Sequence, residues 1–183
     1  MINNNGHLIS SAEATVSVSN RGLAYGDAIF ETIKTLNGKI LFWEDHYFRL
    51  MASMRILRME IPMAFTPEFL ESQILELLNH NKSNSNSFRV KLTVFRKQGG
   101  FYTPDINDVN YFITADSLES DLYLLSGSNC IIELFKDFYV APGLLSTLKT
   151  NNKVLNVLGS VYAKENQYDN CLLLNTNKSI VEA

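Results

Sequence analysis

The first part of the chain alternates apolar and polar residues in short segments, and two longer segments follow helical spacing instead. Alternation predicts strands, because successive side chains of a strand point to opposite faces. Apolar residues three and four positions apart predict helices over 43–57 and 66–81, the second with Thr66 as N-cap and Pro67 at its first position. The strands predicted here cover 7–9, 30–36, 39–42, 88–96 and 111–115, and 15–18 reads as a strand or a loop edge.

A polar, acidic segment at 117–127 separates this pattern from a second one. We expect an α+β fold with a complete small domain at 1–116, a linker at 117–127 and the start of a larger domain at 128–183. The last strand begins only four residues before the end of the sequence, which suggests that the larger domain is incomplete. The elements predicted after the linker are strands at 130–134, 171–175 and 179–182 and a helix at 152–167.

Composition excludes several function classes. The chain has 183 residues, 46% of them hydrophobic, and a net charge of −3 without a basic stripe, so no nucleic-acid partner is expected. No apolar segment approaches the roughly 20 residues of a membrane span, and no signal peptide is recognisable, so we expect a cytoplasmic protein. Cys130 and Cys171 match no metal-ligand spacing, which predicts reduced thiols and no metal site.

Three groups of residues could carry chemistry. The segment Arg21–Thr32 predicts a tight loop that leads into a strand, and His46 and Arg49 share one face of a helix. Lys149 precedes a predicted helix, and Glu182 lies in the last predicted strand. Taken singly, each charged residue is more simply explained as part of the solvated surface.

Together, however, these motifs resemble those of the class IV, or fold type IV, pyridoxal phosphate enzymes. That family includes branched-chain aminotransferases, D-amino acid aminotransferases and 4-amino-4-deoxychorismate lyases. Singly the motifs are weak, but their order and spacing are specific. They are Arg21-Gly22-Leu23, Tyr25-Gly26-Asp27, Phe30-Glu31-Thr32, Asn37-Gly38-Lys39, His46-x-x-Arg49-Leu50 and Leu148-Lys149-x-x-Asn152.

The resemblance implies pyridoxal 5′-phosphate as cofactor and assigns roles to particular residues. Lys149 would be the Schiff-base lysine, with Lys153 as the alternative. Glu182 would pair with the pyridine nitrogen, and Arg49 would hold the phosphate. An amine of this kind attacks only when neutral, so burial and neighbouring positive charge would have to lower its pKa.

The resemblance also suggests substrate contacts at Tyr25, Phe30 and Arg96. Two residues depart from the family pattern: Asn20 replaces an aspartate before Arg21, and Phe30 stands where some members carry a tyrosine. The first would alter a local turn, and the second would remove a hydroxyl group from the site. Arg89 is a weaker candidate for a substrate contact.

The form Lys-x-x-Asn resembles the lyase and D-amino acid branches, and the glycine-rich aromatic segment 95–102 resembles the lyase branch. We expect a 4-amino-4-deoxychorismate lyase that forms 4-aminobenzoate and pyruvate. The alternative is a transaminase of D- or branched-chain amino acids with a 2-oxo acid acceptor. Family members continue well beyond this length, so a truncated, non-catalytic paralogue is a further alternative. The resemblance implies a homodimer and a small-molecule substrate, and an unrelated α+β binding domain would require the motifs to be coincidence.

Overall fold

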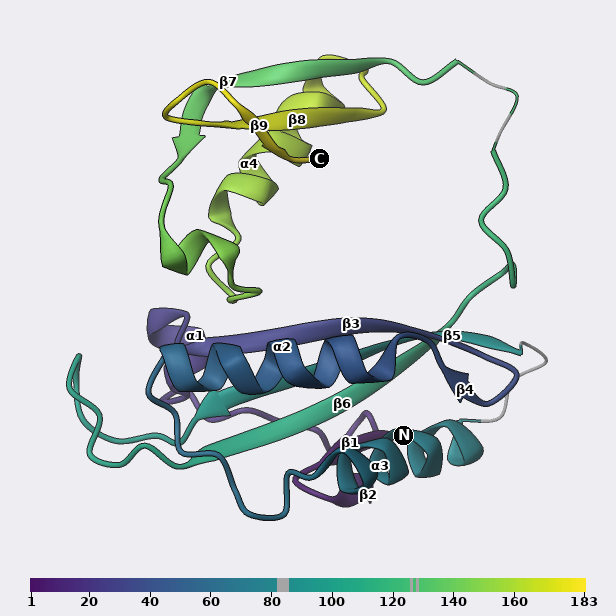
Figure 1. Ribbon diagram of the computed structural model, residues 1–183, viewed down its shortest axis with the longest axis vertical. Coiled ribbons are helices and arrows are strands. Elements are labelled where there is room, and N and C mark those ends of the chain that lie inside the picture. Colours follow the sequence, from purple (N-terminus) through teal and green to yellow (C-terminus); the bar gives the residue numbers. More distant parts are fainter. Residues whose placement is uncertain (82–85, 126, 128) are drawn as a thin grey trace. The chain divides into compact units, whose positions relative to one another are not determined.

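The computed structural model describes residues 1–81, 86–125, 127 and 129–183, and these residues form two compact units (Figure 1). Unit 1 comprises residues 1–123 together with 149–151, and unit 2 comprises 124–148 and 152–183. The division after residue 123 falls inside the segment that the sequence predicts as a linker. Each unit has its own sheet and its own core. No helix in these described ranges is long and apolar enough to cross a membrane.

Unit 1 is built on a six-stranded antiparallel sheet in the order β2-β1-β6-β5-β3-β4. Long pairings join β3 to β5 and β5 to β6, so three of the strands extend along most of the unit (Figure 1). The strands are β1 (Ile2–Asn4), β2 (His7–Ile9), β3 (Ala28–Leu36), β4 (Lys39–Ile40), β5 (Ser87–Arg96) and β6 (Val109–Ser117).

Two helices cover one face of this sheet. Helix α2 (Trp43–Ile56) packs on β3, and α3 (Pro67–His80) packs on β6 and β1. The Thr66 hydroxyl accepts a hydrogen bond from the backbone N–H of Phe69 at 3.1 Å, so the predicted N-cap and the predicted first-turn proline are confirmed. Fully buried side chains from both layers form the core between them, including Ile33, Leu50, Met54, Leu70, Ile74, Val90, Leu92 and Ile113.

The opposite face of the sheet carries polar, charged and aromatic side chains. Strand alternation places one row of residues there from each of the three long strands. In register, Phe30 lies opposite Thr93, Thr32 opposite Lys91, and Lys34 opposite Arg89. We call this surface the open face; its residues on β3, β5 and β6 are Phe30, Thr32, Lys34, Arg89, Lys91, Thr93, Phe95, Asn110, Phe112, Thr114 and Asp116.

The segment before β3 is helical, which corrects the prediction of a simple loop. Helix α1 (Arg21–Tyr25) begins after Asn20, whose side-chain oxygen accepts a hydrogen bond from Leu23 N–H at 3.0 Å. Gly26 ends it in the left-handed region at φ 66°. Asparagine in place of the family's aspartate therefore still caps this turn.

Two strand predictions in unit 1 need comment. Segment 15–18, predicted as a strand or a loop edge, contains no strand, although its side chains alternate. The return strand of the hairpin ends at Ile40, because Phe42 adopts a left-handed backbone conformation at φ 54° and its carbonyl accepts a hydrogen bond from His46 N–H. Strand β1 was not predicted at all, since asparagine is uncommon in strands.

Unit 2 contains a three-stranded sheet in the order β7-β8-β9, formed by β7 (Ile132–Val140), β8 (Asn170–Asn175) and β9 (Ile180–Glu182). Strands β7 and β8 are parallel, and the 3-10 turn η1 (Leu144–Thr147) and helix α4 (Val154–Glu165) lie between them in the chain. A Cβ atom on Gly159 would lie 2.8 Å from Cys171 Sγ, so the glycine allows α4 to approach β8 closely. The small core consists of Phe135, Ala163, Cys171 and Leu173.

The two cysteines differ in exposure, which gives a test of unit 2. Both thiols are free; Cys130 is exposed and Cys171 is buried in the core beneath α4. Burial raises the pKa of the Cys171 thiol, so less of the reactive thiolate forms at pH 8. We expect iodoacetamide to modify Cys130 much faster than Cys171, as followed by peptide mass spectrometry. Equal rates in the native protein would contradict this packing, and urea should remove the difference.

Candidate functional site

Lys149 is attached to β3 of unit 1. Its carbonyl accepts a hydrogen bond from Phe30 N–H at 2.8 Å, and Asn151 N–H donates to the carbonyl of Ala28 at 3.0 Å. These bonds hold the segment 149–151 at the start of β3. The Lys149 ammonium lies 5.5 Å from the centroid of the Phe30 ring, and the described residues offer it no carboxylate.

Lys153 and Glu182 meet within unit 2. Lys153 precedes the first turn of α4, and Glu182 lies in β9, opposite Leu173 of β8. Their Nζ and Oε1 atoms are 3.5 Å apart, and both side chains are partly exposed, by 32% and 43%. An amine and a carboxylate, the two groups that a pyridoxal phosphate site would need, are therefore adjacent in Lys153 and Glu182.

The hairpin that carries Glu182 is fixed by a local signal in the sequence. The Asn175 side-chain oxygen accepts hydrogen bonds from the backbone N–H groups of Asn177 and Ser179, each at 2.9 Å. Such bonds stabilise a turn directly after a strand. They return the chain along β8 and so place Glu182 in β9.

The sequence around Lys153 also carries the motif of a Schiff-base lysine. Lys153-Val154-Leu155-Asn156 has the same Lys-x-x-Asn form as the segment from Lys149 to Asn152. Spacing alone therefore does not separate the two lysines. Within unit 2, Lys153 has Glu182 beside it.

Arg49 and His46 of α2 meet Glu31 of β3. The Arg49 guanidinium donates from Nε to Glu31 Oε1 at 2.7 Å and from Nη2 to Oε2 at 2.5 Å, a bidentate pair. His46 Nδ1 lies 2.8 Å from the same Oε2. Glu31 is only 2% exposed, whereas Arg49 is 43% exposed, so the pair joins a buried carboxylate to a cation at the surface.

This arrangement keeps Arg49 charged and leaves part of it available. The hydrogen bonds that Arg49 donates to Glu31 raise the pKa of Arg49 above its ordinary value, and burial opposes that rise. Glu31 engages Nε and Nη2, and among the described residues Nη1 has no hydrogen-bond acceptor. A guanidinium with free N–H groups at the surface can bind an anion such as a phosphate.

The structure shows Arg96 in a network of structural hydrogen bonds, and its substrate contact stays a prediction. Its side chain is buried, and Nε donates to the carboxylate of Asp27 at 2.9 Å. The terminal nitrogens donate to the carbonyls of Leu57 and Arg58 and to the side chain of Asn107. Through these bonds Arg96 joins β5 to the end of α2.

Buried Arg21 shares Asp27 with Arg96 and organises the segment 99–102. Its terminal nitrogens donate to the backbone carbonyls of all four residues of this segment. Phe101 and Tyr102 are strongly exposed, and the ring of Tyr25 lies 5.6 Å from that of Tyr102. Tyr25 of α1 therefore packs beside the exposed aromatic residues of the segment 99–102.

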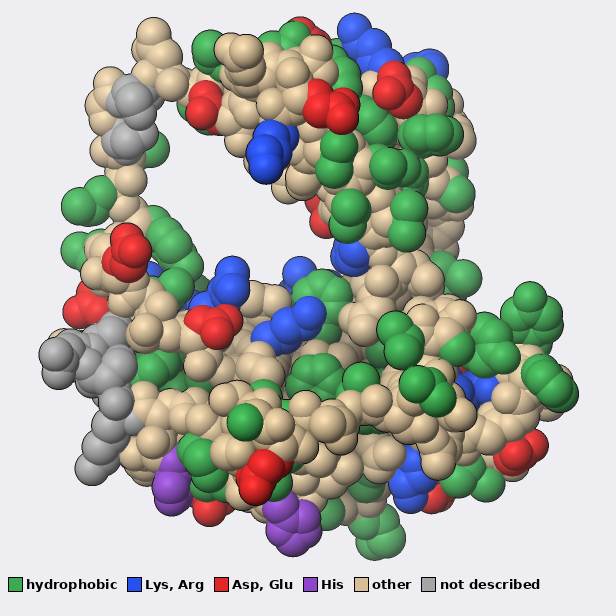
Figure 2. Space-filling view, turned by 180° about the vertical axis from the view of Figure 1, so that it is seen from behind, with side chains coloured by type: hydrophobic (Ala, Val, Ile, Leu, Met, Phe, Trp, Pro, Cys, Tyr) green, Lys and Arg blue, Asp and Glu red, His purple; other side chains and the backbone are tan. Residues whose placement is uncertain are grey.

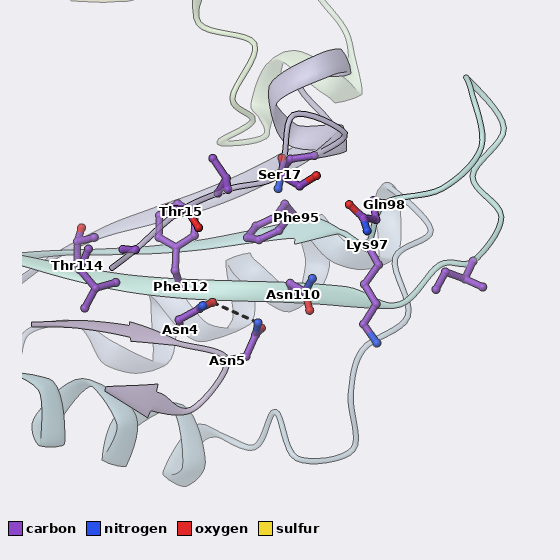
Figure 3. A pocket seen from close by; sticks show the side chains of 15 residues that line it. Asn4, Asn5, Thr15, Ser17, Phe95, Lys97, Gln98, Asn110, Phe112 and Thr114 are labelled. Atoms are coloured by element: carbon purple, nitrogen blue, oxygen red, sulfur yellow. Dashed lines mark hydrogen bonds between the residues drawn. The ribbon is translucent and has the colours of Figure 1, made fainter. Parts of the chain in front are cut away.

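A cavity of about 570 Å³ lies on the open face, between β5, β6 and the segment 14–17. Figure 3 shows the side chains that line it. Phe95 and Phe112 contribute aromatic rings to it, and Asn4 and Asn110 contribute carboxamides. Among the described residues, Lys97 is its one titratable lining residue, and Asp108 pairs with that lysine at 3.0 Å. The cavity therefore offers little for acid–base chemistry. Across the described part of the chain, no cluster of histidine, cysteine or acidic side chains could hold a metal ion.

Comparison with known proteins identifies the protein family to which this chain belongs. The family model for class IV amino-transferases matches residues 28–183, and the chain therefore belongs to the class IV aminotransferase family. A D-alanine aminotransferase from Listeria monocytogenes is 27% identical over 164 residues, which cover 87% of this chain and 53% of that protein. One from Staphylococcus aureus is 28% identical over 163 residues, covering 88% and 54%. The chain thus spans about half the length of these relatives.

Solved structures confirm the predicted fold type IV architecture. The branched-chain amino acid aminotransferase of T.th., solved with pyridoxamine 5′-phosphate, is 24% identical with a TM-score of 0.85, covering 99% of this chain and 61% of that one. The Escherichia coli enzyme is 21% identical with a TM-score of 0.80, covering 99% and 60%. A proposed 4-amino-4-deoxychorismate lyase from Legionella pneumophila is 16% identical with a TM-score of 0.74, covering 94% and 61%. At these identities the likeness shows the fold.

Proposed function

We propose that this chain belongs to a pyridoxal 5′-phosphate-dependent aminotransferase whose catalytic lysine is Lys153. The observation that carries the proposal is the 3.5 Å approach of Lys153 Nζ to Glu182 Oε1 within unit 2. Enzymes of this class need an amine to attach the cofactor and a carboxylate for its ring nitrogen. The sequence-based assignment of Lys149 stays a prediction, and the geometry favours Lys153.

The residues present suit such a cofactor. Within unit 2, Lys153 would attach it and Glu182 would hold its ring nitrogen. Arg49 of unit 1 stays the phosphate ligand that the resemblance implies, and its free N–H groups suit an anion. When bound, the cofactor supplies an electron sink for the negative charge that develops at the substrate α-carbon. The protein's own contribution would be proton movement: the Lys153 amine would take the proton from the substrate α-carbon and deliver it to the cofactor carbon that receives the amino group. Glu182 would keep the ring nitrogen protonated through charge pairing.

A transaminase acting on D-amino acids is the preferred activity. It is supported by the two relatives named D-alanine aminotransferase, which each match more than four-fifths of this chain. A branched-chain activity has weaker support, because the solved branched-chain enzymes show the fold alone. A homodimer, implied by the resemblance, is proposed for the complete protein.

The lyase is the second candidate, and a specific segment favours it. The segment 99–102 combines two glycines at positive φ with exposed aromatic residues. It is part of the glycine-rich aromatic segment whose sequence resembles that of the lyase branch. A Cβ atom on Gly100 would collide with the Thr103 carbonyl oxygen, so this conformation depends on glycine. The segment therefore has a defined shape that could contact a substrate.

Product analysis of the complete protein separates the two activities. D- and L-amino acids would be paired with 2-oxoglutarate, and 4-amino-4-deoxychorismate would be tested for release of 4-aminobenzoate. We expect amino-group exchange with D-amino acids to be the fastest reaction. Release of 4-aminobenzoate without amino-group exchange would establish the lyase instead, and no turnover of either kind would favour the non-catalytic paralogue.

A further inference from the structure

Glu31, His46 and Arg49 form a cluster in which one carboxylate oxygen serves two neighbours. His46 Nδ1 lies 2.8 Å from Glu31 Oε2, and Arg49 Nη2 lies 2.5 Å from the same oxygen. His46 Nδ1 and Arg49 Nη2 are themselves 3.2 Å apart. All three residues belong to unit 1, so the cluster is complete within that unit. The proposed function uses Arg49 and leaves His46 without a role.

These distances indicate where His46 carries its first proton. A ring nitrogen without hydrogen would direct its lone pair at the carboxylate from 2.8 Å, which is repulsive. We therefore assign the hydrogen to Nδ1, which donates to Glu31, so Arg49 Nη2 cannot use this nitrogen as an acceptor. The second proton of the imidazole then binds at Nε2, and it adds a charge while the hydrogen bond to Glu31 is kept.

The net charge of the cluster depends on His46. While His46 is neutral, the carboxylate of Glu31 balances the guanidinium of Arg49, although 43% of the Arg49 side chain is exposed. Once His46 is protonated, the three groups together carry one positive charge. Two cations then compete for the same oxygen, which weakens the hold of Glu31 on Arg49 Nη2. Both effects favour an external anion at the exposed edge of Arg49.

Few other charges act on this cluster. Asp45 of α2 adds a negative charge near Arg49 whether or not His46 is protonated. Helix α3 also contacts α2, but within the described ranges it contributes no ion pair to the cluster. Figure 2 shows acidic as well as basic side chains on the face of unit 1 that it draws, and the net charge of the chain is −3. No broad positive field therefore supplies anion affinity, and the local charge decides it.

We propose that His46 is a positioning residue that controls the anion affinity of Arg49 through the carboxylate they share. A proton at Nε2 strengthens phosphate binding at Arg49, and loss of that proton weakens it. Histidine ordinarily titrates between about pH 5 and 8, so anion affinity is greatest below this range and falls as pH rises through it. The inference deepens the proposed function, on which the phosphate role of Arg49 rests.

The test titrates the complete protein with sulfate and follows the backbone amide signals of α2 by NMR. Sulfate keeps both negative charges over this pH range, so a change in affinity reports on the protein. At constant ionic strength, we expect sulfate to bind roughly 3- to 10-fold more tightly at about pH 5.5 than at about pH 8, a linkage of about half to one pH unit.

Three variants assign this effect to the cluster. His46→Asn should bind sulfate equally at both pH values, because the asparagine amide can replace the Nδ1 donor to Glu31 without titrating. His80→Gln, at an exposed histidine of α3, is the matched control that should keep the full pH dependence. Arg49→Met should abolish the sulfate-dependent shifts in α2. Circular dichroism and urea midpoints of every variant would establish that the fold is intact.

Two results would overturn the inference at His46: an affinity of the unaltered protein that does not change with pH, or a pH dependence that His46→Asn retains. Absence of sulfate binding, or binding that Arg49→Met retains, would overturn it at Arg49. These titrations need no turnover. A complete protein that transaminates no amino acid would therefore reject the proposed function and leave this inference standing.

Discussion

Replacing Lys153 with alanine is expected to abolish covalent attachment of pyridoxal phosphate to the complete protein. The reason is that Lys153 is the amine that β9 brings within 3.5 Å of a carboxylate. Transamination should fall at least about 10²–10⁴-fold, the contribution of a positioned acid–base group. Borohydride reduction followed by peptide mass spectrometry would locate the attached cofactor in the unaltered protein.

Lys149→Ala is the matched control, since the two lysines lie in neighbouring positions and share the Lys-x-x-Asn form. It should retain the attached cofactor at Lys153. A label found on Lys149, and lost in Lys149→Ala, would instead support the assignment made from the sequence. Attachment in the Lys153→Ala protein would contradict the proposed role of Lys153.

Replacing Arg49 with methionine is expected to destabilise the cofactor-free protein by about 1–3 kcal/mol. Glu31 would remain buried after losing a bidentate partner, with His46 as its remaining contact. The partial exposure of Arg49 keeps the expected loss below that of a fully buried ion pair. Urea denaturation would measure the free energy of unfolding.

The origin of this loss is tested by a second substitution. If the unpaired carboxylate is responsible, Glu31→Gln combined with Arg49→Met should be less destabilising than the sum of the two single changes. Arg55→Met, an exposed arginine of the same helix, should cost no more than about 0.5 kcal/mol. Additive losses at Glu31 and Arg49 would contradict the coupling.

Most of the fold could be predicted because its elements carry local signals. Helix α3 has Thr66 and Pro67 at its start and an apolar stripe along one side. The turn at Asn37-Gly38 joins β3 to β4, as its sequence indicates. What failed depended on pairing between distant segments. Strand β1 forms because β6 and β2 provide partners on both sides, although its asparagines favour turns.

For the candidate site, the sequence could predict which residue types take part, but not which residues contact one another. The sequence indicated a lysine, a glutamate and an arginine of a class IV enzyme, and the family is confirmed. It could not show that Arg49 faces a buried carboxylate, because α2 and β3 meet only in the folded unit. Nor could it show that Arg96 is surrounded by acceptors from Asp27, Leu57, Arg58 and Asn107.

The sequence by itself determined the family, the order of most elements and the residue types available for chemistry, because these depend on local spacing and turn signals. Tertiary structure decided which lysine accompanies Glu182 and which cations stay without a carboxylate. Lys149 and Lys153 differ by four positions and share one motif. Hydrogen bonds to β3 nevertheless place Lys149 beside Phe30, while the turn after β8 places Glu182 beside Lys153. Charge pairing depends on distance in space, and strand pairing sets that distance.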